Sequence, residues 1–238
     1  MIEVNDLTVR FGGVVSLDSM TIEFPDGTCG LIGPNGAGTT TFFNVMSGYV
    51  TPEFGSVLIE GTDVLGMQSF QRARWGVRRT FQTEQAIEGL TVFDNVATVY
   101  EHSGKGTRSA RKASVNEALD FVGLTTVRNQ LVRTLPVKER RFIEVARAVV
   151  GEPKVVLLDE PAAGLPDEET EELSTIIRAI PEHTGATVIL VDHDMSLVQA
   201  CCAWTAVLDF GRLLAAGSTS DVLRDERVLA AYIGADIA

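Results

Sequence analysis

The stretch Gly33-Pro34-Asn35-Gly36-Ala37-Gly38-Thr39-Thr40-Thr41 follows a short apolar run and opens into a segment of helical character. Its three glycines let successive backbone N–H groups turn toward one anion. A helix beginning near Thr39 would add the partial positive charge of its N-terminus. The stretch departs once from the phosphate-loop pattern G-x-x-x-x-G-K-[ST], because Thr39 stands where a lysine is expected. It therefore predicts a phosphate-binding loop of nine residues, with the Thr40 hydroxyl as a Mg²⁺ ligand, although a plain glycine-rich turn has the same local pattern.

The composition limits the kind of protein that carries this loop. The chain has 238 residues, 45% of them hydrophobic, and a net charge of −12 from 20 Lys+Arg and 32 Asp+Glu. Because binding of nucleic acid needs clustered cations, the acidic balance argues against a nucleic-acid partner. Cys29, Cys201 and Cys202 lack metal-site spacing and indicate reduced thiols. No apolar run is long enough to cross a bilayer and no signal segment begins the chain, so we expect a soluble protein that is still able to sit on a membrane protein.

Strand and helix patterns alternate around the loop. Short alternating strands separated by turns precede it, and two continuous apolar runs, "KVVLLDE" and "ATVILVDHD", are typical of buried parallel strands. Between about residues 83 and 150, apolar residues recur at three-to-four spacing, which predicts helices. We therefore expect an α/β fold with an N-terminal antiparallel β subdomain, a core of residues 1–82 and 151–238, and a helical insert of residues 83–150.

Some local predictions can be checked directly against a structure. "HSGKGTRSARKAS" is small, polar and basic and predicts a solvated loop, with contact to lipid headgroups as a functional alternative. An acidic helix is expected from Glu168 to Ile180, stopped by Pro181. "TAVLDFGRLLAAG" predicts a pair of strands, and "DVLRDERVLAAYIG" predicts one closing amphipathic helix.

Three side chains stand where the apolar runs end. Asp159 closes one run, Glu160 follows it, and His193 follows the second. A carboxylate at the end of a buried strand can hold Mg²⁺, and the next acid can polarise water against a γ-phosphate. Taken singly, each has an ordinary explanation, namely exposed acids after a strand and a hydrogen-bonded histidine. Their order along the chain, after a glycine loop, favours a nucleotide site.

With these motifs in place, nearly the whole sequence resembles the nucleotide-binding subunit of ABC transporters. That resemblance implies a P-loop NTPase (RecA-like) core that uses ATP and Mg²⁺. It implies that Phe11 stacks on adenine and that Gln82 is the Q-loop residue, which senses nucleotide, ligates Mg²⁺ and touches the membrane subunit. It also implies that Asp159 is the Walker B metal ligand, Glu160 the catalytic glutamate and His193 the switch histidine. "RRTFQT", "LTVFDNV" and "LLDEPAAGL" are similar to the Liv-type group, which imports branched-chain amino acids, with urea and amide importers as relatives.

The sequence departs from the family's pattern at three places. Thr39 replaces the lysine that reaches the β- and γ-phosphates. The signature region reads Leu135-Pro136-Val137-Lys138-Glu139, without the serine and glycines of the family, and Pro166 follows "GL" where the family has a polar residue. The loss of a hydrogen bond to a charged group costs roughly 1.5–3 kcal/mol. We expect nucleotide binding to persist and turnover to be weakened, and Lys138 is a candidate cation acting in trans on a partner's nucleotide.

The resemblance also implies partners. We expect a heterodimer with a second ABC nucleotide-binding subunit, two membrane permease subunits, and indirect contact with a solute-binding protein, at the cytoplasmic face of the inner or plasma membrane. Two alternatives stay open. One is a catalytically impaired pseudo-ATPase that acts as scaffold or regulator within a transporter, and the other is a soluble ABC protein with no link to a membrane. In the transporter interpretation, Val92 and Phe93 are expected to line a groove for a coupling helix of the permease.

Overall fold

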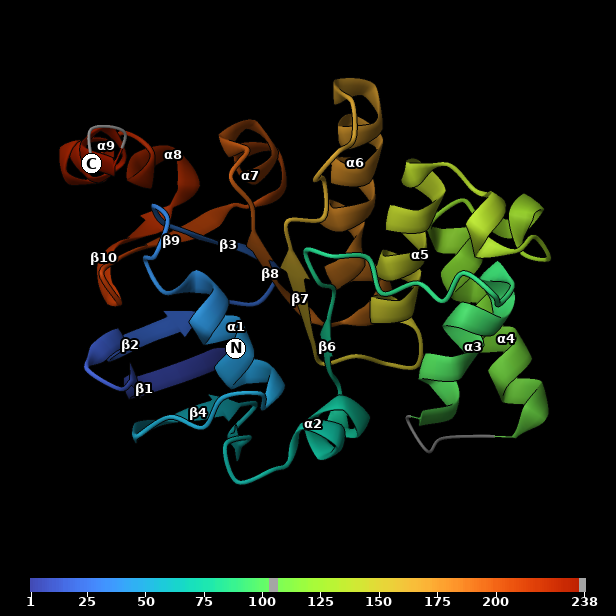
Figure 1. Cartoon of the computed structure of the whole chain (residues 1–238), viewed down its shortest axis with the longest axis horizontal. Helices are drawn as coiled ribbons and strands as arrows, with labels where there is room; N and C mark the ends of the chain where they lie inside the picture. Colours follow the sequence, from blue (N-terminus) through green and yellow to red (C-terminus); the bar gives the residue numbers. More distant parts are fainter. Residues whose placement is uncertain (103–106, 236–238) are drawn as a thin grey trace.

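The computed structural model describes residues 1–102 and 107–235 and consists of two β-sheets and a group of helices (Figure 1). The strands are β1 (Ile2–Phe11), β2 (Val14–Phe24), β3 (Thr28–Ile32), β4 (Phe54–Ile59), β5 (Thr62–Asp63), β6 (Val77–Arg79), β7 (Val155–Asp159), β8 (Thr187–Val191), β9 (Trp204–Asp209) and β10 (Arg212–Ser218). The helices are α1 (Thr39–Ser47), α2 (Ser69–Trp75), α3 (Val92–His102), α4 (Arg108–Phe121), α5 (Val137–Val149), α6 (Asp167–Thr184), α7 (Met195–Cys201), α8 (Thr219–Val222) and α9 (Glu226–Ala235), with 3-10 turns η1 (Thr125–Val127) and η2 (Val132–Thr134).

The N-terminal strands form an antiparallel sheet of order β2-β1-β4-β5. Ile2 pairs with Phe24 and Val4 with Ile22, so the apolar residues of both strands lie on the same, buried face. The chain turns between β1 and β2 at Gly12, whose φ of 60° is accessible to glycine at little cost. The predicted antiparallel subdomain is confirmed, and its strands lie beside α1 (Figure 1).

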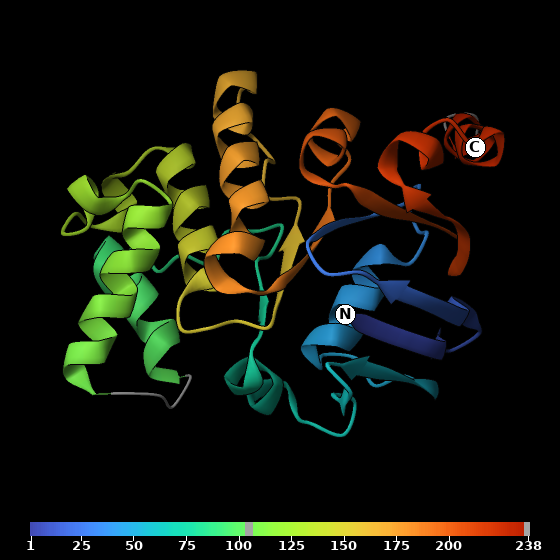
Figure 2. The same ribbon diagram turned by 180° about the vertical axis from the view of Figure 1, so that it is seen from behind.

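The second sheet carries the predicted buried strands, in the order β10-β9-β3-β8-β7-β6. Strands β9, β3, β8, β7 and β6 are parallel, and β10 joins as an antiparallel edge. Alternate residues of β7 face opposite sides: Val155 and Leu157 pack with α1, while Val156 and Leu158 pack with α6 and α7. Figure 2 shows α6 and α7 covering the face opposite α1. Burial on both faces explains why these strands are continuous apolar runs.

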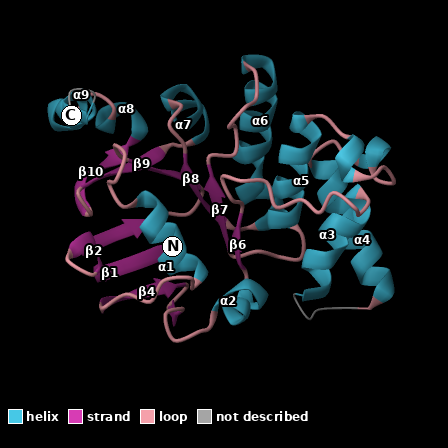
Figure 3. Cartoon of the chain, in the orientation of Figure 1, coloured by secondary structure: helices cyan, strands magenta, loops and turns pink. Residues whose placement is uncertain are grey.

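Helices α3, α4 and α5 gather at the end of the molecule opposite the antiparallel sheet (Figure 3). Their apolar faces share one hydrophobic cluster with α6 and with one face of the parallel sheet. The predicted insert at residues 83–150 thus packs on the core through a continuous apolar contact. The boundaries assigned to the two parts remain a prediction.

Three local expectations are wrong. Helix α6 continues through Pro181 to Thr184 and ends at Gly185, with φ of 75°. Its last turn is stabilised by the His183 ring, which stacks on Phe121 of α4 at 4.1 Å, and by the Gly185 N–H, which donates to the Pro181 carbonyl at 2.8 Å. The basic stretch is helical from Arg108 onward, since Thr107 caps α4 by accepting a hydrogen bond from the Ala110 N–H at 3.3 Å. The rest of that expected loop, residues 103–106, lies outside the described residues.

The expected closing helix is also divided. Helix α8 is a single turn capped by the Ser218 hydroxyl, and α9 begins only at Glu226. The predicted strand pair before it is confirmed as β9 and β10. Within the described part of the chain, no helix combines the length and apolar character needed to cross a bilayer.

Candidate nucleotide site

The glycine loop leaves the C-terminal end of β3 and leads directly into α1. Gly36 and Gly38 have φ of 83° and 107°, and the Ala37 N–H donates to the Pro34 carbonyl at 2.9 Å. A side chain at Gly38 would place its Cβ 2.6 Å from the Ser16 carbonyl oxygen, so β2 excludes any other residue there. Helix α1 has no acidic side chain in its first turn. Its N-terminal N–H groups are therefore available for an anion.

The three threonines of the loop have different surroundings. Thr41 Oγ1 lies 2.7 Å from Ser16 Oγ, which ties α1 to the antiparallel sheet. Thr40 is exposed at the first turn of α1, and Thr39 is partly exposed beside it. The loop thus presents backbone donors and the exposed Thr40 hydroxyl, with Thr39 at the position where the phosphate-loop pattern has lysine.

Parallel pairing of β7 and β8 brings two of the predicted catalytic residues together. Asp159 is in register with Val191, so the residues that follow the two strands meet at one edge of the sheet. Glu160 has φ of 47°, and its N–H donates to the Val191 carbonyl at 2.8 Å. This unusual backbone conformation turns the Glu160 side chain toward His193.

Glu160 is held from two sides. Gln82 Nε2 donates to Glu160 Oε2 at 2.9 Å, and His193 Nε2 lies 3.2 Å from Glu160 Oε1. The main-chain carbonyl of Gln82 in turn accepts a hydrogen bond from Arg141 of α5 at 3.2 Å. The structure therefore joins Gln82, Glu160 and His193, three residues from distant parts of the chain, in one polar cluster.

Asp159 has a partner that sequence reasoning missed. Arg79 NH2 donates to Asp159 Oδ2 at 2.7 Å, and both side chains are buried. The same guanidinium donates to Asn44 Oδ1 of α1 at 2.7 Å and stacks over Phe81. Two consecutive arginines before "TFQT" were the available signal, but only the pairing of β6 with β7 shows which carboxylate one of them meets.

A second missed residue is Asp192, which precedes His193 and is buried. Burial raises its pKa, and the nearby charge of Glu160 raises it further, against the opposing hydrogen bond from the Asp194 N–H at 3.0 Å. The Ala162 N–H also opposes this rise, while burial remains its largest cause. The carboxyl group next to Glu160 is thus one that resists ionisation.

The donor set suits a magnesium ion that arrives with a nucleotide. In the described chain, no group of three or more His, Cys, Asp or Glu side chains could hold a metal alone. Mg²⁺ commonly takes one or two protein oxygens and completes its shell with phosphate and water. The exposed Thr40 hydroxyl and the Asp159 oxygen that does not face Arg79 fit this need. Gln82 bonds to Glu160 through Nε2, so its amide oxygen is not used in that contact.

The remaining predicted site residues lie elsewhere. Leu135 is buried, Pro136 precedes α5 and Val137 begins it. Lys138 Nζ lies 2.5 Å from Glu172 Oε2 of α6, and this hydrogen bond raises the lysine pKa, while the enclosed Glu139 Oε2 has no partner among the described residues. Among the described residues, no hydrogen bond or ion pair links 135–139 to the loop 33–41, so a role for Lys138 in trans remains a hypothesis.

Two aromatic and apolar predictions have distinct outcomes. Phe11 is exposed at the end of β1, free to meet a ligand, and its stacking role remains a prediction. Val92 is wrong as a groove residue, because it is fully buried in the cluster formed by α3 to α5. Phe93 is partly buried and lines a hollow of about 330 Å³ together with Arg108, Arg111 and Lys112 of α4.

Known proteins are similar to this chain in sequence and in fold. The chain is 35% identical to the high-affinity branched-chain amino acid transport ATP-binding protein LivG of Escherichia coli, over 98% of each chain. It is 32% identical to the corresponding protein BraF of Pseudomonas aeruginosa, again over 98% of each. The ADP conformation of the ATP-binding cassette MJ1267 has a similar fold, with a TM-score of 0.88, 24% identity and 98% coverage of both chains.

The glycine loop, Asp159 and Glu160 at the end of β7 and His193 after β8 all lie at one edge of a fold that matches ATP-binding cassettes. Residues 17–163 match the family described as ABC transporter, which is more than half of the chain. This protein belongs to the ABC transporter family.

Proposed function

We propose that the chain is the ATP-binding subunit of an importer for branched-chain amino acids or related amide- or urea-type solutes. The observation that supports this most is the placement of Glu160 between Gln82 and His193 beside a glycine loop. The relatives LivG and BraF are named as branched-chain amino acid transport ATP-binding proteins, which supports the solute class.

The described residues suggest how the site works. Backbone N–H groups of the loop and of the first turn of α1 would hold the phosphates, with Thr40 and Asp159 holding Mg²⁺. When bound, Mg²⁺ neutralises charge that develops on the phosphate oxygens. Glu160 would accept a hydrogen bond from the attacking water, and His193 would hold the Glu160 carboxylate in place. Release of Gln82 from Glu160 would free that carboxylate oxygen for water.

A second nucleotide-binding subunit is part of the proposal. Among the described residues, no hydrogen bond or ion pair joins the signature region at 135–139 to the glycine loop of the same chain, so a complete site would need the signature helix of a partner. A heterodimer would place this chain's loop against the partner's signature and the partner's loop against Pro136 to Glu139. Two permease subunits, and a solute-binding protein reached through them, would complete the transporter at the cytoplasmic face of the membrane.

A scaffold role is the second candidate, and Thr39 favours it. Loss of one preorganised charge stabiliser can reduce the rate by about 10²–10³. In that case the chain would bind nucleotide, or only its partners, while the second subunit hydrolyses ATP. Both candidates keep this chain in the transporter, and they differ in whether Glu160 contributes to turnover.

Substitution of Glu160→Gln in the assembled complex separates the two. Gln keeps the shape and the hydrogen-bonding length but removes the acceptor charge, and the loss of a general base typically costs about 10²–10⁴ in rate. Glu168→Gln is the matched control, because Glu168 is an exposed acid in the first turn of α6. A catalytic role predicts that the complex's ATPase rate falls by the share of turnover that this site supplies, while the control is unchanged. Equal rates for the two variants would leave only the scaffold role.

A further inference from the structure

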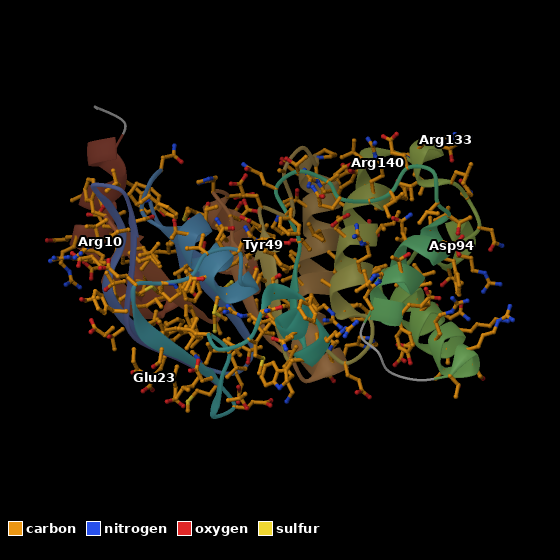
Figure 4. The ribbon with its side chains drawn as sticks, turned by 60° about the horizontal axis from the view of Figure 1, so that its bottom comes forward. Arg10, Glu23, Tyr49, Asp94, Arg133 and Arg140 are labelled. Carbon is orange, nitrogen blue, oxygen red and sulfur yellow. The ribbon has the colours of Figure 1, made fainter. Side chains whose placement is uncertain are left out.

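The group of helices α3 to α5 holds a basic hollow that the proposed nucleotide site does not use. It has a volume of about 330 Å³ and lies beside α4, the start of α3 and the segment after η1. Figure 4 labels Asp94, the residue after Phe93 of the hollow, at the end of the molecule far from β1 and β2. None of the described residues that line the hollow belongs to the loop 33–41 or to the cluster around Glu160. A ligand in this hollow would therefore bind at a separate site.

The charge of the hollow is opposite to that of the whole chain. Its cations are Arg108, Arg111 and Lys112 on α4 and Arg128 after η1. None of the described residues that line it is Asp or Glu, although the chain carries a net charge of −12. Like charges three or four residues apart destabilise a helix, and the first turn of a helix favours acids over bases. These cations therefore do not serve the stability of α4, and an anion bound among them would relieve their repulsion.

The cations are only partly neutralised by the chain itself. Arg111 NH1 donates to Glu101 Oε1 of α3, an exposed acid that does not line the hollow. Arg128 NH1 donates to Asn116 Oδ1 at 3.4 Å, which is a long contact with a neutral group. Within residues 1–102 and 107–235, no hydrogen bond or ion pair joins the side chain of Arg108 or Lys112 to another residue. Three of the four cations thus lack an acidic partner among the described residues.

Main-chain pairing fixes the fourth cation, Arg128, at the hollow. Its carbonyl accepts a hydrogen bond from the Phe93 N–H at 2.9 Å, and the Gln130 carbonyl accepts one from the Val92 N–H at 3.0 Å. The segment is thereby held against the start of α3, where the partly buried Phe93 lines the same hollow. A side chain on a fixed backbone loses less entropy when it binds a ligand. The tertiary structure therefore presents one arginine to the other three cations from a separate segment.

A phosphate group fits this set of donors. A phosphate monoester carries about −1.5 to −2 charges and three acceptor oxygens, and guanidinium groups bind phosphate through paired N–H donors. Asn116 and Asn129 add neutral amide groups to the lining, and Phe93 can cover an apolar part of the ligand. The volume suits a small ligand. A nucleic acid would need a run of cations that continues beyond the hollow, on a chain that is acidic as a whole.

We propose that this hollow binds a compact ligand with a phosphate monoester group, held by Arg108, Lys112 and Arg128. Soluble phosphate esters and the headgroups of anionic lipids share this chemistry, and the experiment below separates the two sources. The bound group would join α3, α4 and the segment after η1, and binding to the folded chain alone would stabilise this group of helices. The inference goes beyond the proposed transport function and does not depend on it.

Phenyl phosphate is the probe for a soluble source, because it joins a phosphate monoester to a ring that can lie against Phe93. NMR of the side-chain amides of Asn116 and Asn129 follows its binding at the hollow itself. Arg128→Met should weaken the affinity about tenfold, through loss of one charge-assisted hydrogen bond, and Arg128→Lys should recover part of it. Lys112→Met changes an exposed position that has little effect on folding, and it should weaken the affinity about threefold.

Phosphatidylcholine vesicles with and without phosphatidic acid test the lipid source by flotation. Flotation that requires phosphatidic acid and is lost in Arg128→Met, without amide shifts from phenyl phosphate, would assign the phosphate group to a lipid. Amide shifts from phenyl phosphate without flotation would assign it to a soluble ester. Arg133→Met is the matched control, since Arg133 is an exposed arginine of η2 that does not line the hollow, and it should bind both probes like the wild type.

Two results would overturn the inference and leave the proposed function standing. The first is that neither probe binds the wild-type chain, or that Arg128→Met and Lys112→Met bind both probes as well as Arg133→Met does. The second is binding of phenyl phosphate that is lost in Gly38→Ala and kept in Arg128→Met, which would place the probe at the glycine loop.

Discussion

Restoring a lysine to the phosphate loop tests the idea that backbone donors and Mg²⁺ carry nucleotide binding in this chain. Thr39 is the first residue of α1 and is partly exposed, so a longer side chain can extend from it. The first turn of α1 contains no acid, and the acidic residue among the predicted metal ligands, Asp159, is already paired with Arg79 at 2.7 Å. A new lysine would therefore lack an acidic partner in its own turn until a nucleotide arrives.

The size of the effect follows from these surroundings. A hydrogen bond to a charged group contributes roughly 1.5–3 kcal/mol, which corresponds to about 10- to 150-fold tighter binding of ATP. In the absence of nucleotide, a cation at the positive end of a helix costs about 0.3–1 kcal/mol. Thr39→Lys should thus bind Mg·ATP more tightly while the free chain becomes slightly less stable.

Calorimetric titration of Mg·ATP into the assembled complex measures the affinity, and urea unfolding of the isolated chain measures stability. Thr39→Met is the control, because it has similar length and no charge. An affinity for Thr39→Lys within threefold of Thr39→Met would refute the expected ammonium contact. A wild-type complex that binds ATP only at the partner's loop would refute the role assigned to the backbone donors of this chain.

Three further outcomes follow from the described geometry. Arg79→Met leaves Asp159 buried and unpaired, so it should lower the free energy of unfolding by about 3–5 kcal/mol in urea titrations. A loss below about 1 kcal/mol would contradict the pairing. Gly38→Ala, with φ of 107° and a Cβ 2.6 Å from a main-chain oxygen of β2, should abolish Mg·ATP binding in calorimetry. Gly36→Ala meets no atom within 4 Å and carries only the strain of a φ of 83°, so it should weaken binding less, and equal losses in the two would contradict this view of the loop. Burial raises the pKa of Cys29 to about 12. Iodoacetamide at pH 8 should therefore label it about a thousandfold more slowly in the folded chain than in urea, as followed by mass spectrometry. A native labelling rate within tenfold of the unfolded rate would contradict this.

Resemblance in the sequence was sufficient to name most of the catalytic cluster. Gln82, Glu160 and His193 were predicted from motifs, and they meet as expected around Glu160. The phosphate loop and the helix that begins at Thr39 were also predictable, because glycine spacing and helix onset are properties of a few adjacent residues. The roles of these residues in catalysis remain predictions.

Contacts between distant segments could not be predicted in the same way. The partner of Asp159 is 80 residues away in sequence, and only the pairing of β6 with β7 brings Arg79 to it. Val92 has an amphipathic helical setting, and the assembly of α3 to α5 decides that it is buried. Helix α6 likewise continues past Pro181, where the His183 ring stacks on Phe121 of α4, and this tertiary contact opposes the local preference of proline.

The sequence alone predicted local features: backbone conformations, the glycine loop and the acids at the strand ends. Each of them arises from neighbouring residues and local sterics. Strand order and helix packing decided which charges are paired and where the basic hollow forms. They also decided which buried groups have no hydrogen-bond partner among the described residues, such as Arg78 Nε. The strength of an ion pair depends on the distance between its charges in space, not on their separation in the sequence. Ion pairs can therefore be assigned only when the folded structure gives those distances.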